Sequence, residues 1–299
     1  MDFKTELNKR VDYIENIIYS SLIDSSKSNP DKQAEIYEAM NYSVQSGGKR
    51  LRPMLMLETS RLFHGRDEDV SYFLTVIELI HTYSLVHDDL EAIDNDEYRR
   101  GRKTTHAVYG EAMGVLCGDA LLNYAFEMGL KGIKAAKDKD RALDALDYIA
   151  TKAGAFGMIG GQVVDIKNEN SDIDIETLDY INELKTGALI EASMVAGAIL
   201  AGATKQEVQS IEKIASNVGK AFQIQDDILD VTSTTEVLGK PVLSDEKNNK
   251  STYVTLLGIE AASEKVKQLS EEAILILREL NEDNVFLTEL IHHLVYRKK

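Results

Sequence analysis

The chain has 299 residues, 43% of them hydrophobic, and a formal net charge of −16. A chain of this length buries roughly three quarters of its unfolded surface, so the composition indicates a globular protein and excludes a disordered acidic tail. The acidic balance excludes nucleic acid as a partner, because nucleic-acid binding needs a basic face, and it repels an anionic substrate unless cations or local arginines intervene.

The cysteine content and the apolar runs indicate the compartment. Cys117 is the single cysteine, so no intrachain disulfide can form and we expect a reducing, cytoplasmic environment. The first residues mix charges of both signs and do not resemble a signal peptide. The longest apolar run, 192–203, is too short for a bilayer of about 30 Å, so we expect no membrane span.

Apolar residues recur with a helical period through most of the chain. In chain order, this period predicts helices over 73–87, 113–128, 178–200, 207–229 and 261–280. Polar and glycine-containing stretches predict loops at 24–31, 63–68, 95–105 and 237–251. Only 3 prolines are present, which suits long helices. No sustained strand alternation and no long linker are found, so we predict one all-α domain over 1–299.

The stretch LVHDDLEAIDNDEYRRGRKTTH crowds carboxylates directly before arginines. Asp88 and Asp89 come at the end of a predicted helix. Asp94 lies six residues after Asp88, so the helix must end or loosen between them. A divalent cation would offset the repulsion between these carboxylates. The alternative is a solvated acidic helix face.

A second acidic cluster, FQIQDDILD, lies at the end of the predicted helix over 207–229. Asp226 and Asp230 are one helical turn apart and share a face, with Asp227 beside them. Mg²⁺ prefers hard oxygen ligands and is usually held by one or two carboxylates plus phosphate oxygens. Two clusters, each at the end of an apolar helix, therefore suggest Mg²⁺ ions that grip a diphosphate.

Basic residues occur where a phosphate could bind. In SGGKRLRP, Lys49, Arg50 and Arg52 follow a glycine pair and open the next helix. Backbone amides at a helix start and guanidinium groups both suit a phosphate. The alternative is an ordinary helix start with surface charges.

Three further polar residues lie inside apolar helical stretches. Lys185 and Thr186 occur in NELKTGAL, where a buried lysine needs an anionic partner unless it extends to water. His81 lies two helical turns before Asp88 on the same face. A lone histidine of this kind is more often a packed core residue. His81 becomes a candidate site residue only because its face of the helix leads to the acidic cluster.

Seven motifs, in this order, carry a family resemblance: SGGKRLRP, HDDLEAIDNDEYRRGRKTTH, GEAMGVLCGDALL, GGQVVDI, ELKTGALI, FQIQDDILD and GKPVLSDEKNNKSTYV. From about Gln45 to the C-terminus the chain resembles the short-chain trans-isoprenyl diphosphate synthases, and most closely the bacterial farnesyl diphosphate synthases. The paired aspartate motifs together with GGKRLRP make this resemblance specific.

The resemblance implies an all-α isoprenoid-synthase-type bundle around a central cavity, usually a homodimer. It implies that about three Mg²⁺ ions bind an allylic diphosphate between the two aspartate motifs. Isopentenyl diphosphate then attacks the allylic cation and a proton is lost. With dimethylallyl and geranyl diphosphate as primers, the product is farnesyl diphosphate.

The resemblance also implies a role for individual residues of this chain. The metal ligands and their neighbours are Asp88, Asp89, Asp94, Asp226, Asp227 and Asp230. The isopentenyl diphosphate site comprises Lys49, Arg52, His81 and Arg100. The allylic diphosphate is held by Arg99, Lys185, Lys240 and Lys250. Thr186 and Gln223 face the allylic cation, Gln162 and Asp165 form a supporting polar pair, and Arg297 and Lys299 belong to a tail that closes over the site.

Product length is implied by residues just before the first aspartate motif. Tyr83 lies five residues before Asp88, where the family limits the chain by residue size, and the small Ser84 follows it. A bulky ring at this position resembles the fifteen-carbon enzymes. Geranylgeranyl relatives tend to carry a smaller residue, so a twenty-carbon product is the alternative, as is a longer-chain synthase.

Four positions depart from the common family pattern. Glu91 and Lys103 stand where proline is usual, and Leu243 and Asn249 stand where glycine is usual. The loss of proline at 91 should loosen the turn that returns Asp94 toward Asp88. None of the four removes a ligand. A terpene cyclase would not need the GGKRLRP motif, and a non-catalytic synthase subunit usually lacks an aspartate motif that this chain keeps.

Overall fold

The computed structural model describes residues 2–24, 30–169, 171–232, 251–280 and 284–295. The chain divides into two compact units, which are described separately below. Unit 1 comprises Met1–Met54 and Asp67–Ala142, and unit 2 comprises Leu55–Arg66 and Leu143–Lys299. Each unit therefore draws on two separate stretches of sequence. The single domain over 1–299 stays a prediction.

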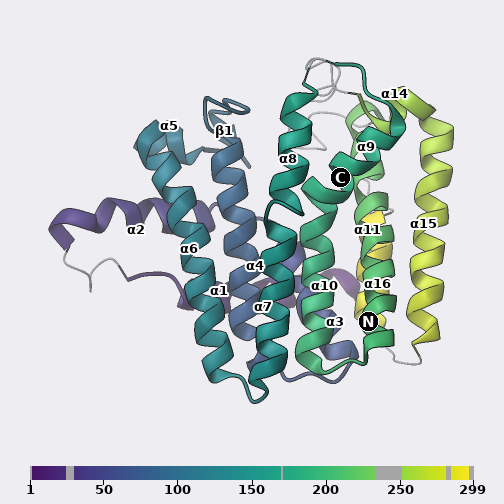
Figure 1. Ribbon diagram of the computed structural model, residues 1–299, viewed down its shortest axis with the longest axis horizontal. Helices are drawn as coiled ribbons and strands as arrows, with labels where there is room; N and C mark the ends of the chain where they lie inside the picture. Colours follow the sequence, from purple (N-terminus) through teal and green to yellow (C-terminus); the bar gives the residue numbers. More distant parts are fainter. Residues whose placement is uncertain (1, 25–29, 170, 233–250, 281–283, 296–299) are drawn as a thin grey trace. The chain divides into compact units, whose positions relative to one another are not determined.

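Unit 1 is built around one apolar helix. Its elements are α1 (Phe3–Ser20), α2 (Pro30–Val44), the start of α3 (Leu51–Leu62), α4 (Asp67–Asp88), β1 (Tyr98–Arg99), β2 (Arg102–Lys103), α5 (Thr105–Tyr109) and α6 (Glu111–Ala135). Helix α4 is buried along most of its length and packs side by side with α6 (Figure 1). Glycine permits this approach, because a Cβ on Gly118 would overlap the His87 ring. The end of α4 is thereby held against α6.

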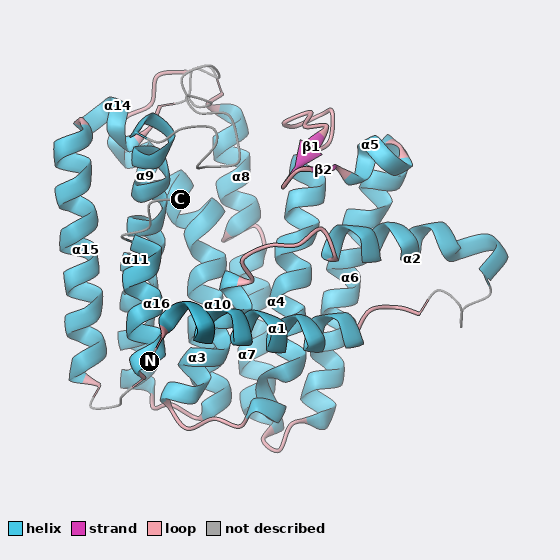
Figure 2. Cartoon of the chain, turned by 180° about the vertical axis from the view of Figure 1, so that it is seen from behind, coloured by secondary structure: helices cyan, strands magenta, loops and turns pink. Residues whose placement is uncertain are grey.

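Strand structure is confined to a small hairpin in the described part of the chain. Tyr98 pairs with Lys103 and Arg99 with Arg102 in an antiparallel register. Figure 2 shows this hairpin in magenta beside α5, and the rest of unit 1 as helix and loop. The hairpin falls inside the loop predicted over 95–105, where two residues per strand are too few to produce a periodic signal.

Unit 2 is a helical bundle whose centre is α10. Its elements are the rest of α3, most of α7 (Lys139–Ala153), α8 (Met158–Lys167), α9 (Ile175–Asn182), the π-helical turn η1 (Glu183–Gly187), α10 (Ala188–Ala201), α11 (Lys205–Thr232), α14 (Tyr253–Leu257), α15 (Ile259–Glu279) and α16 (Val285–Val295). Helix α10 is buried on almost every side. Helix α11 packs against both α10 and α15 (Figure 1).

One helical span in unit 2 meets the length and composition of a membrane helix. It runs over Ile175–Ala201, longer than the run 192–203, with a mean hydropathy of 1.4 in its most apolar window. Of that window, 67% is buried inside the protein, which is the environment of a core helix. Because its apolar surface is already covered by neighbouring helices, we assign it to the core of unit 2.

Candidate active site

The first aspartate motif lies where α4 ends and the chain turns back. Helix α4 ends at Asp88, as the spacing predicted. The amide of Asp94 donates to the Asp88 carbonyl at 2.9 Å, and the Asp96 amide donates to the Asp89 carbonyl at 3.2 Å. Glu91 is exposed in this turn. Backbone hydrogen bonds, including Asn95 to the Leu90 carbonyl at 3.0 Å, close the turn without a proline.

Asp89 differs from its neighbours because it is buried and ion-paired. Its carboxylate accepts from Arg99 Nε at 2.6 Å, and Arg99 Nη2 lies 3.8 Å from Asp96. Burial raises the pKa of Asp89 to about 6, and Arg99 opposes this rise. Asp89 therefore fixes the hairpin arginine beside the motif, which fits the supporting role implied for it.

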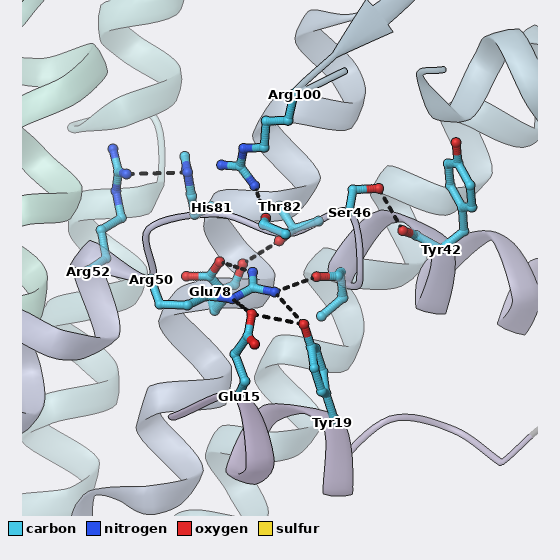
Figure 3. A network of polar contacts seen from close by, with 12 residues as sticks. Glu15, Tyr19, Tyr42, Ser46, Arg50, Arg52, Glu78, His81, Thr82 and Arg100 are labelled. Carbon is cyan, nitrogen blue, oxygen red and sulfur yellow. Dashed lines mark hydrogen bonds and ion pairs between the residues drawn. The ribbon is translucent and has the colours of Figure 1, made fainter. Parts of the chain in front are cut away.

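A cation cluster, defined here as Arg52, His81 and Arg100, lies beside the start of α3 (Figure 3). Arg52 Nη1 lies 3.3 Å from His81 Nε2, and Arg100 donates to the Gly47 carbonyl. Burial, followed by the charges of Arg52 and Arg100, lowers the pKa of His81 well below its usual value. The histidine is therefore neutral, and the arginines supply the charge. Lys49 is exposed in the loop that precedes Arg52.

Arg52 carries an unsatisfied donor. Burial lowers its pKa to about 10, with the charge of Glu78 opposing this effect. Within the described residues, the buried Arg52 Nε has no hydrogen-bond partner. A buried donor without a partner is costly, and a bound anion would satisfy it. The structure thus brings together Arg52, His81 and Arg100, three of the residues implied for one diphosphate.

The second aspartate motif lies on the last turns of α11. Asp226 is half-buried, whereas Asp230 and Asp227 are buried. Asp227 accepts from the Tyr253 amide at 2.9 Å and from Gln223 Nε2 at 3.3 Å. Both carboxylate oxygens of Asp227 are therefore engaged, and this residue ties the motif to the start of α14. Asp226 is the most exposed carboxylate of the three.

A cavity of about 170 Å³ lies in unit 2 beside the π-helical turn η1. Lys185, on this turn, donates to Asp165 at 2.6 Å, so the anionic partner expected for this lysine is confirmed. Thr186, Gln223 and Asp227 also line the cavity. A Cβ on Gly161 would overlap the Lys185 amide nitrogen, so only glycine lets α8 approach the turn this closely. Such π-turns occur often at functional sites.

The carboxylates fit Mg²⁺ held jointly with phosphate. In the described ranges, no three His, Cys, Asp or Glu side chains converge at the spacing of a metal site. Mg²⁺ needs only one or two carboxylates, because water and phosphate oxygens complete its octahedron. Within the first motif, Asp88 and Asp94 offer the hard oxygen donors that this ion prefers, and within the second motif Asp226 does the same. The donor set therefore fits the metal.

The residues implied for product length are buried on α4. Tyr83 is 5% exposed, and its ring meets His87 edge-on with centroids 5.8 Å apart. Within the described residues its hydroxyl has no hydrogen-bond partner; burial, followed by the charge of Asp88, raises its pKa to about 12. Ser84 donates to the His81 carbonyl at 2.9 Å. Tyr83 is thus a buried aromatic ring five residues before Asp88.

Some residues implied by the resemblance lie outside the described part of the chain. They are Lys240, Lys250, Arg297 and Lys299, together with Leu243 and Asn249, two of the positions that depart from the family pattern.

Two residues that contact the site were not expected from the sequence. They are Glu78, a buried acid one turn before His81, and Tyr253, whose amide binds Asp227. The charge at Glu78 inside the apolar helix was the available signal. Tyr253 carried none, because its contact is made by the backbone.

The chain is thus an all-helical protein with a cluster of cationic side chains and two sets of carboxylates at helix ends. The sequence model described as Polyprenyl synthetase matches residues 33–289, and the chain belongs to this family. It is a prenyltransferase. The family resemblance stated from the motifs is confirmed.

Individual relatives agree with this assignment. The chain is 42% identical over 255 residues to a farnesyl diphosphate synthase of Geobacillus stearothermophilus, covering 85% of this chain and 86% of the relative. It is 41% identical over 270 residues to a geranylgeranyl diphosphate synthase of Cyanophora paradoxa, covering 90% and 88%. A crystal structure of an FPP/GFPP synthase from Zymomonas mobilis matches with a TM-score of 0.85 and 32% identity over 100% of this chain and 99% of that one. The expected all-α isoprenoid-synthase fold is confirmed.

Proposed function

We propose that the protein condenses isopentenyl diphosphate head-to-tail with dimethylallyl and then geranyl diphosphate, and that it releases farnesyl diphosphate. The cation cluster carries this proposal, since a buried Arg52 nitrogen without a partner lies beside a neutral His81 and Arg100. Such a group of donors suits an anion that needs no metal. The fifteen-carbon product is supported by the Geobacillus relative and by the bulk of Tyr83.

The roles of individual residues follow the same proposal. Isopentenyl diphosphate is bound by Lys49, Arg52, His81 and Arg100. The allylic diphosphate is bound by Arg99, Lys185, Lys240 and Lys250, and Thr186 and Gln223 stabilise the allylic cation. Mg²⁺ is held by Asp88, Asp94 and Asp226, with Asp89, Asp227 and Asp230 in support. Asp89 contacts Arg99 and Asp227 contacts Tyr253. These contacts agree with a role in which the two aspartates hold neighbouring groups in place and do not bind metal directly.

The reaction balances without a protein nucleophile. The allylic C1–O bond breaks, and its electron pair leaves with diphosphate. The double bond of isopentenyl diphosphate then forms the new bond from its C4 to the allylic C1. A proton leaves C2, and the departing diphosphate accepts it. Bound Mg²⁺ supplies charge neutralisation of the leaving group, while polar groups such as Thr186 and Gln223 face the cationic carbon.

A geranylgeranyl diphosphate synthase is the second candidate, because the Cyanophora relative is almost equally similar. A product assay separates the two. Protein, Mg²⁺ and labelled isopentenyl diphosphate are incubated with either primer, and the dephosphorylated products are sized. A fifteen-carbon alcohol from both primers, abolished by EDTA, supports the proposal. A twenty-carbon product would agree with the proposed chemistry but contradict the assignment of Tyr83 as the residue that limits product length. If folded protein incorporated no label, the proposed activity would be rejected.

The proposal extends to the assembly and the compartment. We propose a homodimer in the cytoplasm, in accordance with the family resemblance. The lone Cys117 is buried, and burial raises the pKa of its thiol to about 11, which suits a protein that keeps its thiol reduced. Sedimentation of the purified protein tests the dimer.

A further inference from the structure

The loop before α3 has an unusual backbone. Gly47, Gly48 and Arg50 all have positive φ, of 82°, 145° and 46°. Glycine adopts such values readily, but a side-chain-bearing residue does so only when its surroundings hold it there. The Arg50 carbonyl accepts the first helical hydrogen bond of α3, from the Met54 amide at 3.1 Å. The conformation of Arg50 therefore fixes where α3 begins, and with it the position of Arg52.

The surroundings that hold Arg50 are a buried set of acceptors. Its side chain is 1% exposed. Its guanidinium donates to Glu15 at 3.0 Å, Glu78 at 2.6 Å, the Tyr19 hydroxyl at 3.0 Å and the Val44 carbonyl at 2.8 Å. Such a planar, multiply bonded guanidinium is rigid, and lysine cannot reproduce its geometry.

The two sides of the loop face different partners. In Figure 3, Arg50 points toward Glu15 and Tyr19 of α1, whereas Arg52 and His81 lie on the other side of the loop. Glu78 and His81 lie on α4, one helical turn apart. The carboxylate that anchors Arg50 and the imidazole beside Arg52 therefore belong to the same turn of one rigid helix.

The hairpin is held to the same loop. Arg100 donates to the Gly47 carbonyl, and a Cβ on Gly48 would lie 2.7 Å from Arg100 Nη1. Arg102 donates to the Gln45 carbonyl at 3.1 Å. A shift of the loop would therefore move Arg100 as well as Arg52.

We propose that Arg50 is a positioning residue for the cation cluster: its buried ion pair with Glu78 sets the loop so that Arg52, His81 and Arg100 converge on one diphosphate. This inference rests on the proposed function, in which that diphosphate belongs to isopentenyl diphosphate. The alternative is an ion pair that only stabilises unit 1. The two explanations predict different effects of changing Arg50: a positioning role affects isopentenyl diphosphate alone, whereas a loss of stability affects both substrates.

The test compares Arg50→Lys with Arg61→Lys. Arg61 lies on the same helix α3 and pairs with the buried Glu58 at 2.8 Å, so the control makes the same substitution beside a buried carboxylate. With Mg²⁺ and geranyl diphosphate, Arg50→Lys should raise the KM for isopentenyl diphosphate about tenfold or more. The KM for geranyl diphosphate should stay within about twofold. An unchanged isopentenyl KM, or an equal rise in both constants, would overturn the proposal.

A second variant separates positioning from stability. Replacing a buried ion pair with apolar residues often leaves stability unchanged, so Arg50→Met combined with Glu78→Met should keep a Tm near that of the wild type. We expect the isopentenyl KM to remain high in this double variant. Recovery of both the Tm and the isopentenyl KM would show that the pair acts on stability alone, and the proposal would be abandoned.

A binding measurement keeps the inference independent of turnover. Titration calorimetry with inorganic diphosphate in EDTA reports the site that needs no metal. Arg50→Lys should weaken this binding about tenfold, and Arg61→Lys should not. Wild-type protein that binds diphosphate but forms no prenyl product would reject the proposed function, whereas equal diphosphate binding by Arg50→Lys and wild type would reject the positioning role.

Discussion

At the scale of single residues, His81 shows how burial decides the protonation of a site. The unfolded chain protonates this histidine below about pH 6.5, whereas in the folded protein its pKa is well below that value because of burial and the neighbouring Arg52 and Arg100. The unfolded state therefore binds the extra proton first. The stability contributed by the neutral histidine is complete above about pH 6.5 and is lost as the pH falls below it.

We therefore predict that His81→Asn reduces the acid sensitivity of folding. Asparagine does not titrate, so the variant should lose less unfolding free energy between about pH 7.5 and about pH 5.5, by up to about 1.4 kcal/mol per pH unit below pH 6.5. Urea unfolding at both pH values measures this difference. Equal losses in the variant and the wild type would show that His81 protonates in the folded protein.

Tyr83 is the residue on which product length depends. Its buried ring lies one turn before the first aspartate motif. Tyr83→Ala removes that bulk, and we predict products longer than fifteen carbons. Truncating a buried aromatic residue costs about 3–5 kcal/mol, so folded protein must be confirmed by circular dichroism. Tyr72→Ala, on the same helix, is the control and should keep the wild-type product. An unchanged product from Tyr83→Ala would place the limit elsewhere.

At the scale of elements, substitutions at the glycine pair before α3 distinguish two effects of an added side chain, which are backbone strain and crowding against Arg100. Both glycines have positive φ, but a Cβ on Gly47 meets open space, whereas one on Gly48 would contact the Arg100 guanidinium. Gly47→Ala should therefore cost only stability, about 1–2 kcal/mol. Gly48→Ala should also displace Arg100 and raise the isopentenyl KM. Urea unfolding and steady-state kinetics give the two readouts, and equal KM values would contradict the crowding argument.

The sequence predicted those elements whose signal is local. The helical period predicted the helix that becomes α4, and the spacing from Asp88 to Asp94 predicted its end. It did not predict the π-turn at Glu183–Gly187, because one wider turn hardly changes the apolar period. Nor did it predict that Arg50 is buried and ion-paired, since a basic residue after two glycines has the pattern of a surface loop and its partner Glu78 is 28 residues away.

At the scale of the whole molecule, the proposed function assigns metal binding with diphosphate to carboxylates of both aspartate motifs. A ligand that binds only the folded state stabilises it, by about 2.7 kcal/mol at one hundred times its Kd. We predict that Mg²⁺ with inorganic diphosphate raises the Tm and that EDTA reverses the rise. Asp88→Asn in unit 1 and Asp226→Asn in unit 2 should each reduce the shift in Tm.

Two controls sharpen this prediction. Mg²⁺ alone and diphosphate alone should each give a smaller shift than the pair, because the proposed coordination needs both carboxylate and phosphate oxygens. Asp138→Asn, an exposed carboxylate paired with Arg141, should leave the shift unchanged. A full shift in both Asp88→Asn and Asp226→Asn would remove these aspartates from the metal site.

The division into two units could not be predicted from the sequence. No linker marks a boundary, because each unit uses two stretches of chain and the residues Leu55–Arg66 of unit 2 lie between stretches of unit 1. The residues proposed for the site are instead concentrated in short motifs that can be recognised in the sequence. Burial at Asp89 and Asp227, by contrast, depends on partners brought by folding.

The construction of unit 2 has a consequence for biosynthesis. Asn284, which caps α16 through the Leu287 amide, donates to the Glu58 carbonyl at 3.0 Å and to its carboxylate at 3.1 Å, across a separation of 226 residues. At about 5–20 residues per second, a ribosome needs roughly 10–50 s to deliver Asn284 after Glu58. During that interval the early segment of unit 2 lacks its last helix, and the apolar surface that α16 later covers stays exposed to water. We therefore expect the nascent chain to bind chaperones.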